Sequence, residues 1–231
     1  MLLSLWSPKG GAGTSVFAAA CALVLSRQYP VRLADLGGDQ PAILGLSSDP
    51  APGLAEWLAA GLHAPAGALD RIAVNVAPNV SLLPRGEQLP SDIAPEAGAA
   101  LGVVLANEPQ LTIADVSHAS TPALQALVEV SDVSVVVVRD CYVALRRALR
   151  HPLVARASGA IVMDDEDRAL GANEVRDVLG LDVFASVPLL VPIARVVDAG
   201  VLATRLPRPL EKAAMRFLAR VGLSGREGRV A

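Results

Sequence analysis

The chain has few aromatic residues, and this shortage limits the kind of core that it can build. Phe, Trp and Tyr together make up 3% of its 231 residues, although hydrophobic residues make up 52%. The core must therefore consist mainly of Ala, Val, Leu and Ile, which suits parallel strands that helices bury on both faces. We predict an α/β fold with a doubly wound, mostly parallel sheet. The length suits one α/β domain or two small ones, and we predict a single domain over residues 1–223, followed by a flexible tail at residues 224–231.

Cysteines, long apolar runs and positive charge are also scarce. The two cysteines, Cys21 and Cys141, are far apart and form no CxxC motif, so neither a zinc site nor a disulfide framework is indicated. No run approaches the roughly 20 apolar residues that cross a bilayer, and no signal-peptide pattern is visible. We therefore expect a cytoplasmic protein without membrane contact. A net charge of −3 argues against a strongly basic nucleic-acid binder, and no specific nucleic acid is predicted.

One local basic cluster stands apart from this acidic balance. An almost unbroken valine run at residues 133–138 predicts a central strand, and Arg146, Arg147 and Arg150 follow it on a predicted helix. The cluster either binds an acidic partner or forms a solvated helix face, and the sequence leaves both interpretations open.

A glycine-rich segment near the start of the chain carries the main functional signal. Residues 7–15 read Ser-Pro-Lys-Gly-Gly-Ala-Gly-Thr-Ser, between an apolar run at 2–6 and a longer apolar run at 16–25. Strand, glycine-rich turn and helix in this order are typical of a phosphate-binding loop, or P-loop. Glycines let a phosphate approach the backbone, whose N–H groups and helix dipole attract the anion. The hydroxyl of Ser15, in the first helical turn, is placed to bind Mg²⁺.

The lysine in this loop is in an unusual position. An ordinary P-loop has Lys immediately before the Ser or Thr, but Thr14 is in that place, and Lys9 lies at the start of the loop. The chain has only one other lysine, Lys212, because 18 of its 20 basic residues are arginine. A compact ammonium suits phosphate oxygens as a point charge, which favours a functional role for Lys9.

Two predicted strands end in aspartate. Asp35 ends the run 31–35, and Asp115 ends the run 111–115 in the form of a Walker B motif, whose carboxylate would hold Mg²⁺ opposite Ser15. In open parallel sheets, ligands gather at the carboxyl ends of the strands. A plain turn or helix-cap role is the alternative for Asp35.

The order Lys9-Gly10-Gly11-Ala12-Gly13 resembles the deviant Walker A loop of the MinD/ParA family. The ending Gly13-Thr14-Ser15 is more similar to its TadZ/CpaE-like branch, whose members localise pili and often lack the second lysine. The resemblance implies a P-loop NTPase with a three-layer sandwich, ATP and Mg²⁺ as cofactors, and a nucleotide-sandwich homodimer in which Lys9 reaches the partner's phosphates.

The same resemblance implies roles for particular residues. Lys9 and Asp35 would serve catalysis, and Ser15 and Asp115 would hold Mg²⁺. The nucleotide would be bound by Lys9, Gly10, Gly11, Ala12, Gly13, Thr14, Ser15 and Pro188.

The sequence departs from the family pattern at two further points. The second carboxylate of switch I, which in the family helps to position the attacking water, is replaced by Gly37, and Asp39 would substitute for it only if the turn brings it back. An asparagine that reads adenine in many relatives is replaced by Met163-Asp164. The missing asparagine leaves the base specificity open. The replacement of the P-loop lysine by Thr14 and of the second switch I carboxylate by Gly37 predicts at most a weak ATPase.

Three functions are weighed on these grounds. The first is a nucleotide-gated or degenerate dimeric localisation factor that positions a pilus or secretion apparatus. The alternative is an active ParA/MinD-type ATPase in DNA partitioning or division-site placement. A metabolic P-loop enzyme is the third, and no substrate-binding insertion is evident for it.

Overall fold

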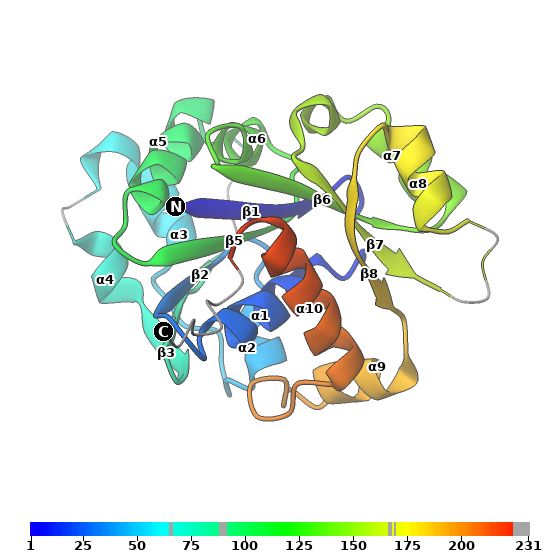
Figure 1. The fold of residues 1–231 in the computed structure, drawn as a ribbon. Coiled ribbons are helices and arrows are strands. Elements are labelled where there is room, and N and C mark those ends of the chain that lie inside the picture. The colour runs from blue at the N-terminus through cyan, green and yellow to red at the C-terminus, as the bar shows by residue number, and fades with distance from the viewer. Residues whose placement is uncertain (65–66, 88–91, 166–167, 169, 224–231) are drawn as a thin grey trace, which may run out of the picture.

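The computed structural model describes residues 1–64, 67–87, 92–165, 168 and 170–223. The predicted flexible tail at residues 224–231 therefore lies outside the described residues. Eight strands form one sheet in the order β3-β4-β2-β5-β1-β6-β7-β8 (Figure 1). Every neighbouring pair is parallel except β3 and β4, which are antiparallel. The strands are β1 (Leu2–Ser7), β2 (Val31–Asp35), β3 (Val74–Ala77), β4 (Val80–Leu83), β5 (Leu111–His118), β6 (Val133–Arg139), β7 (Gly159–Asp164) and β8 (Val183–Pro188).

Helices cover both faces of the sheet, so the predicted doubly wound α/β architecture is confirmed. One face carries α1 (Thr14–Leu25), α2 (Gln40–Leu44), α9 (Val191–Asp198) and α10 (Arg208–Arg220) (Figure 1). The other carries α3 (Leu54–Ala60), α4 (Ala68–Ile72), α5 (Pro95–Ala106), α6 (Pro122–Glu129), α7 (Tyr142–Ala148) and α8 (Ala172–Leu179). Two short 3₁₀ helices span Gly61–His63 and Pro152–Arg156. Among the described residues, no helix has the length and apolar character to cross a membrane.

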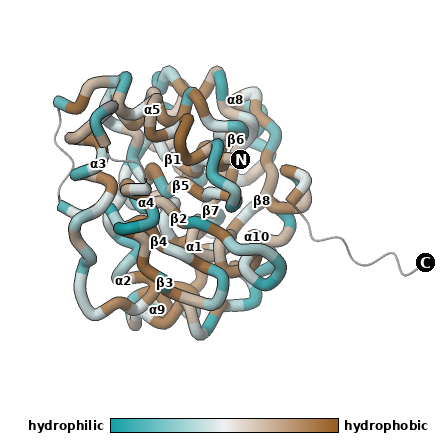
Figure 2. Tube along the Cα trace, turned by 90° about the vertical axis from the view of Figure 1, so that its left-hand side faces the viewer, coloured by the Kyte–Doolittle hydropathy of each residue, from teal (hydrophilic) through white to brown (hydrophobic). Residues whose placement is uncertain are grey.

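Alternation along the strands builds the two halves of the core. Leu3 and Leu5 of β1 pack toward α1 and α10, whereas Leu2 and Trp6 of the same strand pack toward α5 and α6. The valine run of β6 lies between β1 and β7 and is buried on both faces, as predicted. Hydrophobic segments accordingly run along strands and helices, and hydrophilic ones gather mostly in outer turns (Figure 2).

The parallel arrangement brings distant segments of the chain to one edge of the sheet. The carboxyl ends of β1, β2 and β5 lie side by side, with Asp35 directly opposite Asp115 in the register of β2 and β5. Loops that follow these strands therefore meet above the start of α1, where the P-loop lies.

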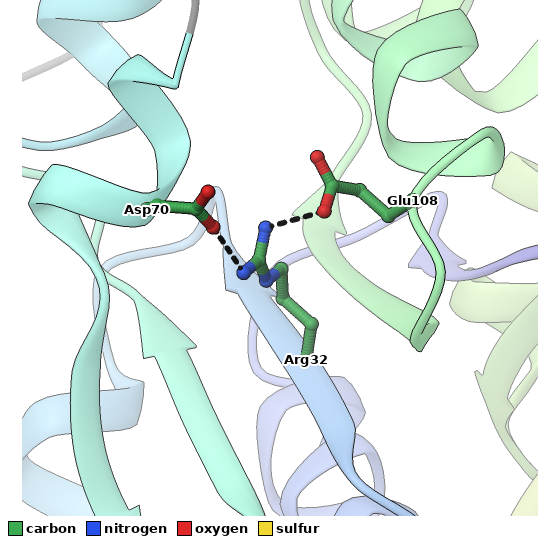
Figure 3. A network of polar contacts seen from close by, with 3 residues as sticks. All are labelled: Arg32, Asp70 and Glu108. Atoms are coloured by element: carbon green, nitrogen blue, oxygen red, sulfur yellow. Dashed lines mark hydrogen bonds and ion pairs between the residues drawn. The ribbon is translucent and has the colours of Figure 1, made fainter.

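A buried arginine joins two peripheral segments to β2. Arg32 is 3% exposed, and its guanidinium donates to Glu108 Oε2 and to Asp70 Oδ1, each at 2.8 Å (Figure 3). Asp70 belongs to α4, and Glu108 lies between α5 and β5. The arginine thereby ties both connections to the sheet.

The two carboxylates differ in burial, and we expect their removal to differ in cost. The Glu108 side chain is 20% exposed and the Asp70 side chain is 72% exposed. Glu108→Ala should lower the free energy of unfolding by about 2–3 kcal/mol, because it leaves a buried charge with one partner. Asp70→Ala should cost less than about 1 kcal/mol, since water screens the charge of the exposed Asp70 carboxylate. Urea denaturation measures both values, and equal losses would contradict this account of the network.

Candidate nucleotide-binding site

The predicted strand, loop and helix are all present at the start of the chain. β1 is buried along its whole length and ends at Ser7, and α1 begins at Thr14. Gly13 is the N-cap of α1 with φ 85°, and Gly11 has φ 73°, so both adopt the left-handed conformation that favours glycine. A Cβ at Gly13 would lie 2.6 Å from Cε of Met163, so the glycine also leaves room for this side chain from the end of β7.

The outer side of the loop is open. A Cβ built on Gly10 or Gly11 would meet no atom within 4 Å. A cavity of about 880 Å³ lies against Gly10 to Val16 and extends to α2 and the end of α9. The residues that line its far side are Ala42, Ile43, Gly45, Leu46 and 197–201. A space of this size suits a nucleotide, with phosphates at the polar loop and an apolar wall beyond.

Lys9 is not among the residues that line this cavity. It instead lines a small cleft with Pro8, Val138 and Ala144, against β6 and α7. It is half-buried, and no ion pair or hydrogen bond of its ammonium occurs among the described residues. Thr14 does line the cavity, and its buried Oγ1 has no hydrogen-bond partner there. The loop's only cation is therefore not placed at the loop's own cavity.

The two aspartates predicted at the strand ends form a buried pair. Both are 0% exposed. Burial raises the pKa of the Asp35 carboxyl, and the charge of Asp115 raises it further, although the N–H groups of Gly38 and Gln40 and the Arg85 guanidinium oppose the shift. Burial likewise raises the pKa of Asp115, against hydrogen bonds from Gln40 and Ser15. The hydrogen bonds to the pair that occur among the described residues come from neutral donors, and Arg85 is the cation that favours the ionised form of Asp35.

Gln40 is the central donor, and the sequence did not point to it. Its Nε2 donates to Asp115 Oδ2 at 2.8 Å and to the Ser15 carbonyl at 2.9 Å, while its backbone N–H donates to Asp35 Oδ2 at 3.2 Å. Its Oε1 is buried without a partner. Gln40 therefore connects both aspartates to the start of α1, and only its place just after the switch I segment hinted at this.

Ser117 closes the site on the side of β5. Its φ of 52° is left-handed, which is uncommon for a residue other than glycine and typical of functional loops. Its hydroxyl lies 3.1 Å from Ser15 Oγ, and its carbonyl accepts from Ser7 Oγ at 3.1 Å. A Cβ at Gly37 would lie 2.6 Å from Ser117 Oγ, so the position of the missing switch I carboxylate has no room for a side chain in this conformation.

Arg85 is a second residue that sequence reasoning missed as a site residue. It lies in the turn after β4, and its guanidinium donates to the Gly37 carbonyl at 2.6 Å. The first turn of α3 holds this turn, since the N–H groups of Leu54 and Ala55 donate to the carbonyls of Pro84 and Arg85. A fixed cation thus lies beside switch I, on the side of Asp35.

Of the remaining residues named from the sequence, some line the cavity and others do not. Pro188 ends β8 opposite Asp164 of β7 and does not line the cavity. Asp39 is exposed and lines the cavity, and its charge raises the pKa of Asp115. His118, whose catalytic role the sequence did not favour, is exposed.

The residues present fit a magnesium nucleotide. No group of three or more His, Cys, Asp or Glu side chains is placed to hold a metal among the described residues. Mg²⁺ in nucleotide sites needs only one or two protein oxygens, because the phosphates and water supply the rest. Ser15 and Asp115, which are linked by a hydrogen bond, can provide these oxygens, and the open glycines leave space for phosphate.

Comparison with solved structures identifies the fold as that of MinD and ParA ATPases. MinD of Pyrococcus horikoshii OT3, complexed with Mg-ADP, matches with a TM-score of 0.78 at 17% identity over 99% of both chains. A ParA family ATPase from Chlorobium tepidum matches with a TM-score of 0.76 at 20% identity, over 95% of this chain and 97% of that one. An ATP complex of a Cyanothece McdA variant gives 0.76 at 20% identity, over 97% of both chains. The predicted MinD/ParA-like architecture is therefore confirmed.

Sequence relatives are fewer. No family model matches the chain. The uncharacterized Mycobacterium tuberculosis proteins Rv3660c (strain H37Rv) and MT3760 (strain CDC 1551) are each 32% identical over 240 residues, covering 96% of this chain. The chain spans 65% of the length of these relatives.

Substitutions at Gln40 test whether the aspartate pair depends on a neutral donor. Gln40→Glu should lower the free energy of unfolding at pH 8 by about 3 kcal/mol more than Gln40→Met, because it places a third buried carboxylate beside Asp115. Burial raises the pKa of Asp115 to about 6 and that of Asp35 to about 7. As the pH falls toward 5, these carboxyls and the introduced one therefore take up protons, the repulsion falls and the difference should shrink. Urea titrations at both pH values measure this, and a gap that is constant or grows in acid would contradict it.

Proposed function

We propose that this protein belongs to the MinD/ParA family and acts as a nucleotide-gated dimeric localisation factor with weak or no ATP hydrolysis. The position of Lys9 carries the proposal. The ammonium lies outside its own cavity and has no partner among the described residues, so it is available to the phosphates of a second subunit. Thr14, in the place of the usual lysine, supplies no charge within the subunit.

The proposed ligand is ATP with Mg²⁺. The N–H groups of residues 10–15 would hold the phosphates, and Ser15 and Asp115 would hold the metal. Pro188 would contact the base. The specificity for the base stays open, because Met163 occupies the place of the asparagine that reads adenine in many relatives. The metal would neutralise charge on the phosphates. Support comes from the open loop, the cavity and the neighbours of the same fold, of which one is complexed with Mg-ADP and one with ATP.

Slow hydrolysis is proposed from the arrangement of switch I. Asp35 is engaged by N–H groups of its own turn, and Gly37 contributes no carboxylate and packs against Ser117. Asp39, at the cavity wall, is the only carboxylate of this segment exposed to solvent and therefore the one candidate to replace the missing residue.

The proposed task is positioning a pilus or secretion apparatus from the cytoplasm, in the manner of TadZ/CpaE. It rests on the Gly13-Thr14-Ser15 ending and the absent second lysine. An active ATPase for DNA partitioning or division-site placement is the alternative, and it predicts clear turnover that DNA or membrane stimulates.

The two lysines of the chain give a matched test of dimerisation. Mg·ATP should convert the wild-type protein into a dimer on size exclusion with light scattering, and Lys9→Ala should abolish this shift because the cross-subunit charge is lost. Lys212→Ala removes the other lysine, which is exposed on α10, and should dimerise like the wild type. Phosphate release is measured on the same samples.

Two results would count against the proposal. Dimerisation that survives Lys9→Ala removes the cross-subunit role of the ammonium. Fast turnover by the isolated wild-type protein removes the weak-hydrolysis part and favours the partitioning ATPase.

Placing a lysine at position 14, where an ordinary P-loop has one, tests nucleotide binding separately from hydrolysis. Thr14→Lys should tighten binding of a fluorescent ATP analogue by about tenfold or more, because a charge-assisted hydrogen bond is worth about 1.5–3 kcal/mol. Phosphate release should stay low, since Gly37 still provides no carboxylate. Thr14→Ala is the control and should bind like the wild type. Unchanged affinity in Thr14→Lys would show that Thr14 does not face the phosphates.

A further inference from the structure

The outer face of α7 combines unpaired arginines with exposed apolar side chains. Tyr142, Val143 and Leu149 are 69%, 51% and 58% exposed, and Tyr142 is the most exposed of the large hydrophobic side chains that the structure describes. Arg146, Arg147 and Arg150 are also exposed, and none of them takes part in an ion pair within the described ranges. We define these six residues as the α7 surface.

The spacing places four of these residues in adjacent rows. On α7, Tyr142 and Arg146 are four residues apart, as are Val143 and Arg147, and Leu149 and Arg150 follow directly after the helix ends at Ala148. The opposite side of the helix, with Ala144, Leu145 and Ala148, is buried against β6 and the neighbouring helices. The fold therefore buries one side of α7 and leaves the charged and apolar side to solvent.

Local electrostatics explain only part of this arrangement. Cations near a helix C-terminus interact favourably with the helix dipole, which accounts for one or two arginines. It does not account for three large apolar side chains beside them. Three acidic side chains of the adjoining segments pair with other arginines, since Asp177 of α8 pairs with Arg176, and Asp140 and Asp165 pair with Arg168.

We propose that the α7 surface binds an acidic peptide segment of a partner protein, whose carboxylates pair with Arg146, Arg147 and Arg150 and whose apolar side chains pack on Tyr142 and Leu149. Tyrosine and arginine are the residue types that carry most of the binding energy in protein interfaces. Complementary charge favours an acidic occupant, since three arginines without partners lie on a chain of net charge −3.

The same features disfavour other occupants. A membrane-binding helix has a continuous apolar face with its charges on the other side, whereas arginine and apolar residues alternate on this helix of seven residues. Nucleic acid would gain contacts from only about three phosphates, which gives little affinity at physiological salt.

This inference names a partner class for the proposed localisation function, but the peptide surface can be tested without nucleotide. Twelve-residue peptides are selected from a random phage-displayed library on the full chain, with subtraction on the R146E/R147E/R150E variant. The selected peptides should be rich in Asp and Glu and should contain Leu, Phe or Trp. A labelled copy is then titrated by fluorescence anisotropy, with and without Mg·ATP.

The variants separate charge, contact and background. Binding should weaken about 30-fold or more in R146E/R147E/R150E and less in the neutral R146Q/R147Q/R150Q variant, because reversed charges add repulsion. Tyr142→Ala should weaken it about tenfold. The control R208E/R216E/R220E replaces three exposed arginines of α10, which have no ion pair within the described residues, and should change binding less than about twofold. Circular dichroism checks that each variant is folded.

Several results would overturn the proposal. Selected peptides that lack acidic residues, or that bind R146E/R147E/R150E as tightly as the wild type, would do so. Binding of 1:1 phosphatidylcholine–phosphatidylglycerol vesicles or of a 30-base-pair duplex that depends on the α7 surface, with no acidic peptide selected, would assign the surface to lipid or nucleic acid. If the protein is a dimer without ATP and still binds the acidic peptide, the proposed nucleotide gating is wrong, whereas the proposed peptide binding by the α7 surface is supported.

Discussion

Two buried carboxylates side by side impose the strictest constraint on this molecule. Asp35 and Asp115 lie opposite each other on neighbouring strands, and both are removed from water. Burial and mutual repulsion oppose their ionisation, so every segment near them supplies donors. Gly38 and Gln40 donate from the turn after β2, Ser15 from α1, and Ser117 from the end of β5. The hydrogen bonds that the two carboxylates require thereby fix the relative positions of the P-loop helix, switch I and the loop after β5.

The same hydrogen bonds make these segments interdependent. Ser7, at the end of β1, donates to the carbonyl of Ser117, and the Ser117 hydroxyl reaches Ser15. Gln40 joins Asp115 to the first turn of α1. A cation held by Ser15 and Asp115 would compete with Gln40 for the Asp115 carboxylate, and α2 begins at Gln40. The start of α2 is thus the element whose position most directly depends on what binds the carboxylate pair.

Sequence reasoning reached the elements whose pattern is local. The valine run of β6, the Asp-ended strands β2 and β5, and the glycine-rich turn before α1 each have a signature within about ten residues. The antiparallel edge strand β3 and the short helix α4 were not predicted, because four- and five-residue elements with mixed exposure give no clear periodicity. Gln40, Ser117 and Arg85 acquire their roles from contacts that span 48 to 102 residues of sequence. Nothing within a window of sequence specifies such contacts, and the cleft that Lys9 lines is equally a property of the fold.

The position of Lys9 also links the two surfaces proposed here. Lys9 lines a small cleft together with Ala144, which belongs to the buried side of α7, and with Val137 and Val138 of β6. Among the described residues, no ion pair joins Lys9 to α7. A movement of Lys9 toward another subunit would therefore break no charge pair with this helix. Coupling between nucleotide and partner would then lie at the lower end of the usual range, about 1 kcal/mol. A partner on the α7 surface would accordingly distinguish the two nucleotide states by a modest change in affinity and not by an all-or-none switch.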